Sequence, residues 1–254
     1  MEPVIDTMRH RSVFDPAEFN FPMHVIGAGA TGSRVFAALI ELGMKRINVY
    51  DYDTVESHNI ANQIYTAEDI GGLKINGCAR FAKRKVGSGN ILPAGINVRE
   101  CKVTREYINS HSWDGVVFLL TDTMQSRREI FDALAARCIE LNGPNSTGGQ
   151  MRRVPLLIIE TRMGSTHGSV FTVNPFDSNQ CEQWRSTLVD DEDEDAIELS
   201  PCGTALSVGT TASLIANYAV WQMMQFFVDP VGMQPRIDFY FKPTLTIASS
   251  ALAA

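Results

Sequence analysis

The residues of this chain best suited to chemistry begin with three glycines, Gly27, Gly29 and Gly32, in the pattern G-x-G-x-x-G. An apolar run over residues 23–26 precedes them, and a second apolar run ends at Asp51, 19 positions after the last glycine. In such a pattern the first glycine permits a tight turn, the second lets the backbone approach a phosphate, and the third lets helix and strand pack closely. An acid at the end of the second strand accepts hydrogen bonds from ribose hydroxyls. The spacing therefore predicts a nucleotide site.

The residues that follow Asp51 indicate which nucleotide. Asp53 comes next, then the amides Asn59 and Gln63, and then Lys74. A hydride-transfer site needs a flat apolar slot for a nicotinamide, whereas this segment supplies amide donors and a cation that can neutralise a triphosphate. The pattern favours ATP over a dinucleotide.

Asp122 is the candidate metal ligand. It follows the apolar run 116–120, which is typical of a buried parallel strand, and ligands of open α/β sheets bind at the carboxyl ends of such strands. A carboxylate there can hold Mg²⁺, which prefers oxygen ligands and bridges phosphates. The other interpretation, that Asp122 caps the following helix, stays open at this point.

Apolar runs and helical periodicity place the elements that must position these residues. Strands are expected at 23–26, 46–50, 96–103, 116–120, 156–160, 169–173 and 239–241, and helices at 32–42, 75–85, 126–141 and 203–227. This alternation predicts an α/β, Rossmann-like domain with a mostly parallel sheet and helices on both faces. Residues 1–20 are expected to form an N-terminal arm, and 21–254 a single domain. The acidic run 190–195 predicts a mobile crossover loop over 176–201.

The composition excludes several classes of protein. The 254 residues are 44% hydrophobic and 20% charged, with a net charge of −7 and a pI near 5.3. This acidic balance argues against a nucleic-acid partner. No apolar stretch reaches the roughly 20 residues of a membrane span, and no signal peptide is evident. The five scattered cysteines form no CxxC pair, so we expect a reduced, cytoplasmic protein without a disulfide framework or a four-cysteine zinc site.

Taken together, the motifs resemble the ThiF/MoeB/HesA family, the bacterial relatives of ubiquitin-activating enzymes. The family's D-x-D-x-V-x-x-S-N-L-x-R-Q segment after the glycine turn, its D-x-G-x-x-K, its D-N-x-x-x-R and the C-R-T-A-G that opens the last helix all have counterparts. The matching positions are Asp51, Asp53, Val55, Asn59, Gln63, Asp69, Gly71, Lys74, Asp122, Arg127 and the segment 201–205. The resemblance runs from about residue 24 to 245.

This resemblance implies that the chain uses ATP and Mg²⁺ to adenylate the C-terminal glycine of a small ubiquitin-like or sulfur-carrier protein. It implies that the nucleotide is bound by Gly27, Gly29, Gly32, Asp51, Asp53, Asn59, Gln63, Lys74, Asp122 and Arg127. It also implies that Asp122 coordinates the metal ion. One departure is notable, because Asn62 stands where the family has an arginine that contacts the phosphates. Asparagine lacks that charge and that bidentate fork. Either Arg127 or Arg128 compensates, or adenylation is slowed or lost.

The resemblance also implies a homodimer in which Arg9 or Arg11 reaches the ATP of the partner subunit. It makes Cys202 the candidate nucleophile for thiol transfer, since a thiol at a helix N-terminus has a lowered pKa. Cys181 is the second candidate. The remaining cysteines are expected to be packing residues.

Other functions remain open from the sequence alone. One is the activation of a peptide or small-acid carboxylate. Another is a catalytically weakened partner subunit or scaffold, which Asn62 favours and which the retained Asp51, Lys74 and Asp122 oppose. A third is an NAD-dependent oxidoreductase.

Overall fold

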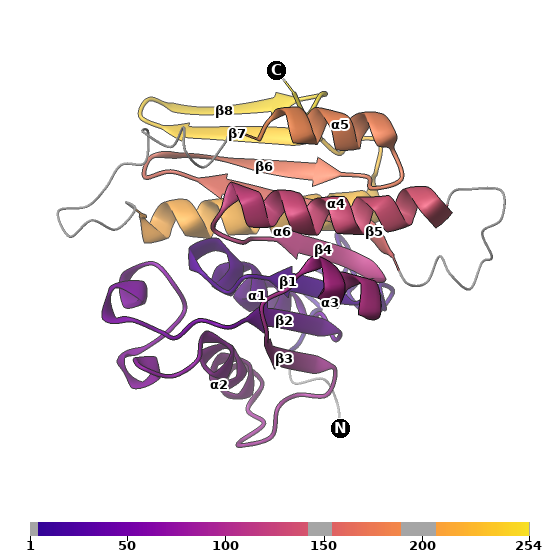
Figure 1. The fold of residues 1–254 in the computed structure, drawn as a ribbon. Helices are drawn as coiled ribbons and strands as arrows, with labels where there is room; N and C mark the ends of the chain where they lie inside the picture. The colour runs from indigo at the N-terminus through magenta and orange to yellow at the C-terminus, as the bar shows by residue number, and fades with distance from the viewer. Residues whose placement is uncertain (1–4, 142–153, 189–206, 254) are drawn as a thin grey trace.

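Strands and helices alternate through the first part of the chain, as the apolar runs predict. In the computed structural model, which describes residues 5–141, 154–188 and 207–253, five strands are parallel and lie in the order β3-β2-β1-β4-β5 (Figure 1). They are β1 (Met23–Ile26), β2 (Ile47–Asp51), β3 (Ile96–Glu100), β4 (Gly115–Leu119) and β5 (Pro155–Met163). Every residue of β1 and β4 is buried, which agrees with their continuous apolar sequences.

The sheet continues past β5 with antiparallel strands. These are β6 (His167–Val173), β7 (Arg236–Phe241) and β8 (Thr244–Ser249), so that eight strands form one sheet. The sequence analysis missed β8. Its residues are almost all exposed, and an edge strand of this kind carries no buried alternation by which a sequence pattern could identify it.

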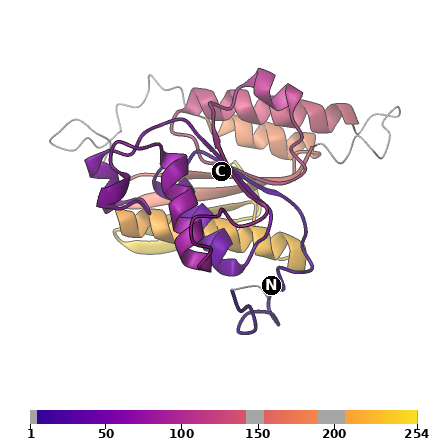
Figure 2. The same ribbon diagram turned by 90° about the horizontal axis from the view of Figure 1, so that it is seen from below.

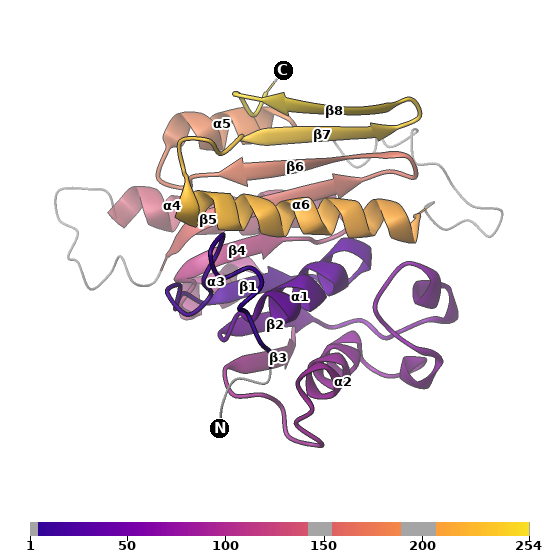
Figure 3. The same cartoon turned by 180° about the vertical axis from the view of Figure 1, so that it is seen from behind.

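Helices cover both faces of the sheet (Figures 2 and 3). One layer holds α1 (Ala30–Leu42), α2 (Lys74–Val86) and α6 (Gly209–Val228), and the other holds α3 (Arg105–Ser110), α4 (Met124–Leu141) and α5 (Ser178–Ser186). Two short 3-10 helices, η1 (Ser57–Ala61) and η2 (Ala67–Asp69), lie in the connection from β2 to α2. A separate hydrophobic cluster fills each side of the sheet. The predicted α/β fold with a mostly parallel sheet is confirmed.

Two expectations about loops need correction. The N-terminal segment is not wholly an arm, because Phe14 is 1% exposed and stacks on Phe19, which in turn contacts Phe227 of α6. The predicted loop 176–201 begins instead with α5. Asp177 caps this helix, and its apolar side chains Cys181 and Trp184 are fully buried. Residues 189–201 lie outside the described residues.

The register of the parallel strands determines where a ligand can bind. Ile26 of β1 pairs with Tyr50 of β2 on one side and with Leu119 of β4 on the other, so these three strands end level with one another. The strand order reverses between β1 and β4, which makes their carboxyl ends a topological switch point. In the described part of the chain no helix combines the length and apolar character needed to cross a membrane.

Candidate nucleotide site

The glycine turn connects β1 to α1, and each of its three glycines meets a different constraint. Gly27 has a φ of +93°, and a Cβ there would lie 2.5 Å from the carbonyl oxygen of Leu120. A Cβ at Gly32 would overlap the carbonyl oxygen of Gly27, so helix and turn can pack only around a glycine. A Cβ at Gly29 would instead meet no atom within 4 Å. Open space therefore lies against the turn, at the point where a phosphate can approach the backbone.

Asp51, the last residue of β2, holds this turn in place. It is 7% exposed, and its carboxylate accepts hydrogen bonds from the backbone N–H of Ala28 (2.6 Å) and of Asp53 (2.8 Å). Burial raises the pKa of Asp51, while these two hydrogen bonds and the nearby Lys74 lower it. The hydroxyl of Tyr65 donates to the carbonyl oxygen of Ala28 at 2.7 Å, so both backbone groups of Ala28 are held. The sequence analysis did not identify Tyr65.

A cavity of about 210 Å³, open to solvent, lies beside the turn. Among its lining residues are Gly27, Gly29, Asp51, Asp53 and Lys74. The ammonium group of Lys74 is 2.8 Å from a carboxylate oxygen of Asp53. The structure thus brings the predicted acids and the predicted lysine together at the carboxyl edge of the sheet.

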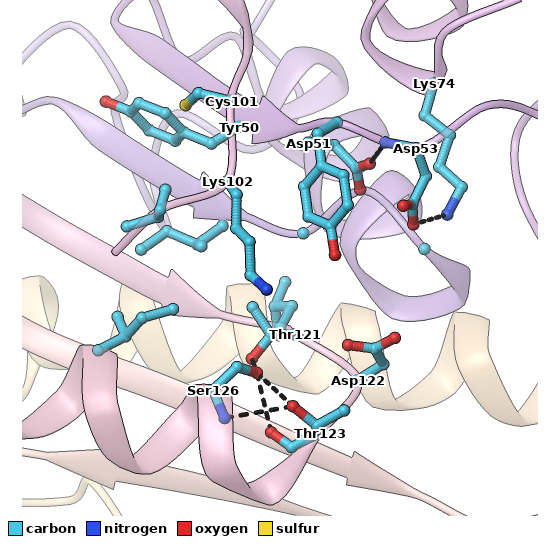
Figure 4. A pocket seen from close by; sticks show the side chains of 17 residues that line it. Tyr50, Asp51, Asp53, Lys74, Cys101, Lys102, Thr121, Asp122, Thr123 and Ser126 are labelled. Atoms are coloured by element: carbon cyan, nitrogen blue, oxygen red, sulfur yellow. Dashed lines mark hydrogen bonds and ion pairs between the residues drawn. The ribbon is translucent and has the colours of Figure 1, made fainter. Parts of the chain in front are cut away.

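The residues after β4 form the opposite wall of the cavity (Figure 4). Thr123, and not Asp122, accepts the hydrogen bond from the backbone N–H of Ser126 that caps α4 (3.2 Å). The carboxylate of Asp122 is exposed and makes no hydrogen bond or ion pair with the described part of the chain. Together with the hydroxyls of Thr121 and Ser126, which are hydrogen-bonded to each other at 2.8 Å, it presents oxygen ligands that suit Mg²⁺.

Sequence analysis missed several lining residues. Lys102 follows β3, and its side chain extends toward Thr121 (Figure 4). Its ammonium group also lies 5.9 Å from the ring centroid of Tyr52. Cys101, expected to be only a packing residue, lines the same cavity. Their position directly after a parallel strand is the signal that could have identified them.

His24 lies in β1, behind the cavity wall. It is 4% exposed, and its ring lies between the hydroxyl of Tyr50 and the carbonyl oxygen of Asp114, at 3.0 Å from each. Because a carbonyl only accepts, Nε2 carries the proton and Nδ1 accepts from Tyr50. Burial lowers the pKa of His24 to about 4, so the ring is neutral at physiological pH.

Three predicted site residues do not line the cavity. The side chain of Asn59 accepts from the backbone N–H of Glu56 at 2.8 Å and so caps η1. Gln63 lies beyond η1, with its side-chain oxygen buried and unpartnered. Arg127 points to β5, where its guanidinium pairs with the fully buried carboxylate of Glu160. Arg127 therefore faces Glu160 in this structure, and its contact with the nucleotide stays a prediction.

The remaining predicted residues lie elsewhere. Arg9 and Arg11 are exposed, and His10 between them is 3.2 Å from the carbonyl oxygen of Leu42, at the far end of α1 from the glycine turn. They cannot reach the cavity of their own chain. Cys181 is buried, and burial raises its pKa to about 11, which does not favour a nucleophile. Cys202 lies outside the described residues. Within the described ranges, no cluster of three or more His, Cys, Asp or Glu residues could hold a metal ion.

The fold and the cavity define a Rossmann-type nucleotide-binding domain. The sequence profile of the ThiF family matches residues 19–249, and the chain belongs to this family. A NEDD8-activating enzyme E1 catalytic subunit of Dictyostelium discoideum is 25% identical over 126 residues, which are 49% of this chain and 27% of that protein. The matched half of this chain therefore spans about a quarter of the length of that relative.

Solved structures show the same fold at low sequence identity. E. coli MccB with ATP has a TM-score of 0.65 and 14% identity, over 94% of this chain and 66% of MccB. The complex of MccB with AMPCPP and MccA has a TM-score of 0.68 and 12% identity, over 100% of this chain and 74% of MccB. PaaA has a TM-score of 0.61 and 14% identity, over 94% of this chain and 66% of PaaA.

Proposed function

We propose that this protein uses ATP and Mg²⁺ to adenylate the C-terminal carboxylate of a peptide or small protein. One observation carries the proposal: the glycine turn, Asp51, Lys74 and Asp122 all line one cavity, and the carboxylate of Asp122 has no partner among the described residues. A dehydrogenase would need an apolar nicotinamide slot, and the charged wall formed by Asp53, Lys74 and Asp122 does not provide one.

The residues present suit this reaction. A substrate carboxylate oxygen attacks the α-phosphorus, the bond between the α-phosphorus and the bridging oxygen breaks, and pyrophosphate leaves with the electron pair. The first turn of α1, which begins after Gly29, directs free N–H groups toward the phosphates. Lys74 adds positive charge on the other side of the cavity. Asp122 would hold Mg²⁺, which neutralises phosphate charge when bound.

The substrate class follows from the relatives. One of them is a NEDD8-activating enzyme, and MccB has been solved in complex with N-formylated MccA. We therefore propose a ubiquitin-like protein, a sulfur carrier or a peptide as the acceptor of AMP. A homodimer in which Arg9 or Arg11 completes the partner's site, and thiol transfer through Cys202, are further parts of the proposal. The alternative, a nucleotide-binding subunit without catalysis, is favoured by the neutral Asn62.

Calorimetry with ATP and with NAD, with and without Mg²⁺, tests the proposal. We expect ATP to bind more tightly than NAD, and Mg²⁺ to strengthen ATP binding. Asp122→Ala should remove the effect of Mg²⁺, while the control Glu18→Ala, an exposed acid in the N-terminal segment, should preserve it. Tighter binding of NAD than of ATP would contradict the proposal. A Mg²⁺ effect that persists in Asp122→Ala would contradict the role of Asp122.

A further inference from the structure

Arg34, in the second turn of α1, is a half-buried cation without an anionic partner. Its Nε donates to the carbonyl oxygen of Asn62 at 3.1 Å, and the guanidinium makes no ion pair with any residue that the structure describes. Burial lowers the pKa of Arg34. A guanidinium removed from water is stabilised by an anion, so a half-buried guanidinium without an ion pair among the described residues is suited to bind an anionic ligand.

The segment that Arg34 contacts carries polar groups without partners in the described part of the chain. They are the buried side-chain oxygens of Asn62 and of its neighbour Gln63. A Cβ at Gly209, the first residue of α6, would lie 3.2 Å from a terminal nitrogen of Arg34 and 2.7 Å from the carbonyl oxygen of Ala61. The start of α6, the end of η1 and α1 therefore meet around this arginine.

This junction follows the glycine turn along α1, and Arg34 itself does not line the cavity. Gly29 lines the cavity and directly precedes α1, and the space against Gly29 is open. Asp53 and Lys74, which also line the cavity, bound the segment that contains η1. A polyphosphate that passes the glycine turn and continues along the start of α1 therefore runs toward the junction of α1 with η1.

We propose that Arg34 binds the terminal phosphates of ATP, which are the leaving pyrophosphate of the proposed reaction. Nε is used by Asn62, and the terminal nitrogens keep N–H donors in a fork that matches phosphate oxygens. Arg127 is less suited to this role, because its guanidinium pairs with Glu160 and does not line the cavity. The inference rests on the proposed function. It places the compensating positive charge on α1, beside the neutral Asn62.

Competition against a fluorescent ATP analogue tests the inference on the full chain. ATP and AMP each displace the analogue from wild type, Arg34→Gln, Arg34→Lys and the control Arg46→Gln. Arg46 is also an arginine that donates to a carbonyl, that of Asn20, but it lies at the amino end of β2. We expect Arg34→Gln to weaken ATP binding by about tenfold or more and AMP binding by less than about twofold. Arg34→Lys should lie between, and Arg46→Gln should match wild type.

A different pattern would overturn the inference. Equal losses for ATP and AMP would mean that Arg34 only positions η1, and an unchanged affinity for ATP would mean that it touches no phosphate. If Arg34→Gln fails to fold, the ratio of ATP to AMP affinity in Arg34→Lys decides between these outcomes. If the wild type and Arg34→Gln bind ATP equally well, the role of Arg34 is overturned and the proposed function is not. A wild type that binds no ATP overturns the proposed function as well.

Discussion

Asp51→Asn is the substitution whose effect follows most directly from the geometry. In the wild type, one carboxylate oxygen accepts from Ala28 and the other from Asp53, at 2.6 and 2.8 Å, and each oxygen keeps a lone pair for a ribose hydroxyl. The amide of asparagine retains one acceptor and loses the charge. Because hydrogen bonds to a charged group contribute about 1.5–3 kcal/mol each, ATP binding should weaken by roughly 2–4 kcal/mol, or about 30- to 1000-fold.

The same change affects the free energy of unfolding. One of the two backbone N–H groups would face the new amide NH₂ and lose its acceptor, which costs about 1–3 kcal/mol. The asparagine side chain is neutral, so it avoids the cost of burying a charge, the same cost that raises the pKa of Asp51. This gain offsets part of the loss in stability. A matched control is Asp177→Asn, because Asp177 also accepts from two backbone N–H groups but does so at the start of α5.

Calorimetry measures the affinity for ATP, and urea unfolding measures the stability of each variant. We expect Asp177→Asn to lose stability while it binds ATP like the wild type. Asp51→Asn should lose both. If Asp51→Asn is less stable and still binds ATP with wild-type affinity, then Asp51 only supports the glycine turn and its assignment to the ribose is refuted.

Three other predictions follow from the packing. Gly32→Ala should lower the melting temperature by about 10 °C or more, because its Cβ overlaps the backbone. Gly29→Ala should keep the wild-type melting temperature and lose ATP affinity. Equal effects of the two substitutions in a thermal melt and in an ATP titration would contradict this contrast. Arg127→Met should cost about 1–3 kcal/mol of stability in urea unfolding, because it removes one partner of the buried Glu160 carboxylate, which keeps Arg162 and Trp184. The folded fraction should bind ATP normally, and a selective loss of ATP affinity would argue against a structural role. His24 should lower the free energy of unfolding by about 3 kcal/mol between pH 7 and pH 4. The reason is that His24 takes up a proton near pH 6.5 in the unfolded state and only near pH 4 in the folded state. If the free energy of unfolding of His24→Gln falls as steeply with pH as that of the wild type, His24 is not the cause.

The sequence predicted the elements whose residues are buried in a regular pattern. The strands ending at Ile26 and Asp51 and the glycine turn between them follow from apolar runs and backbone sterics, which are local properties. The cavity is also lined, as predicted, by Lys74 and by the acids Asp51, Asp53 and Asp122, because the carboxyl ends of parallel strands meet at one edge of the sheet.

The sequence did not predict side-chain contacts whose two residues are far apart along the chain. The spacing from Asp122 to Arg127 fits a ligand motif, but spacing does not reveal that Glu160, 33 residues later, accepts the guanidinium. The sequence does not single out Arg34, because its environment is made by Asn62 and Gly209, which are distant along the chain. The short helix α5 was missed because few of its residues are apolar, and its stability depends on the burial of Cys181 and Trp184.

The products of ATP turnover test the central claim most directly. ATP labelled at the α- and γ-phosphates is incubated with the protein, Mg²⁺ and a small protein or peptide that ends in Gly-Gly, and the products are separated. The account predicts AMP attached to the acceptor and pyrophosphate, both dependent on a free C-terminal carboxylate and both lost when that carboxylate is amidated. Release of ADP and inorganic phosphate, independent of the carboxylate, would contradict it.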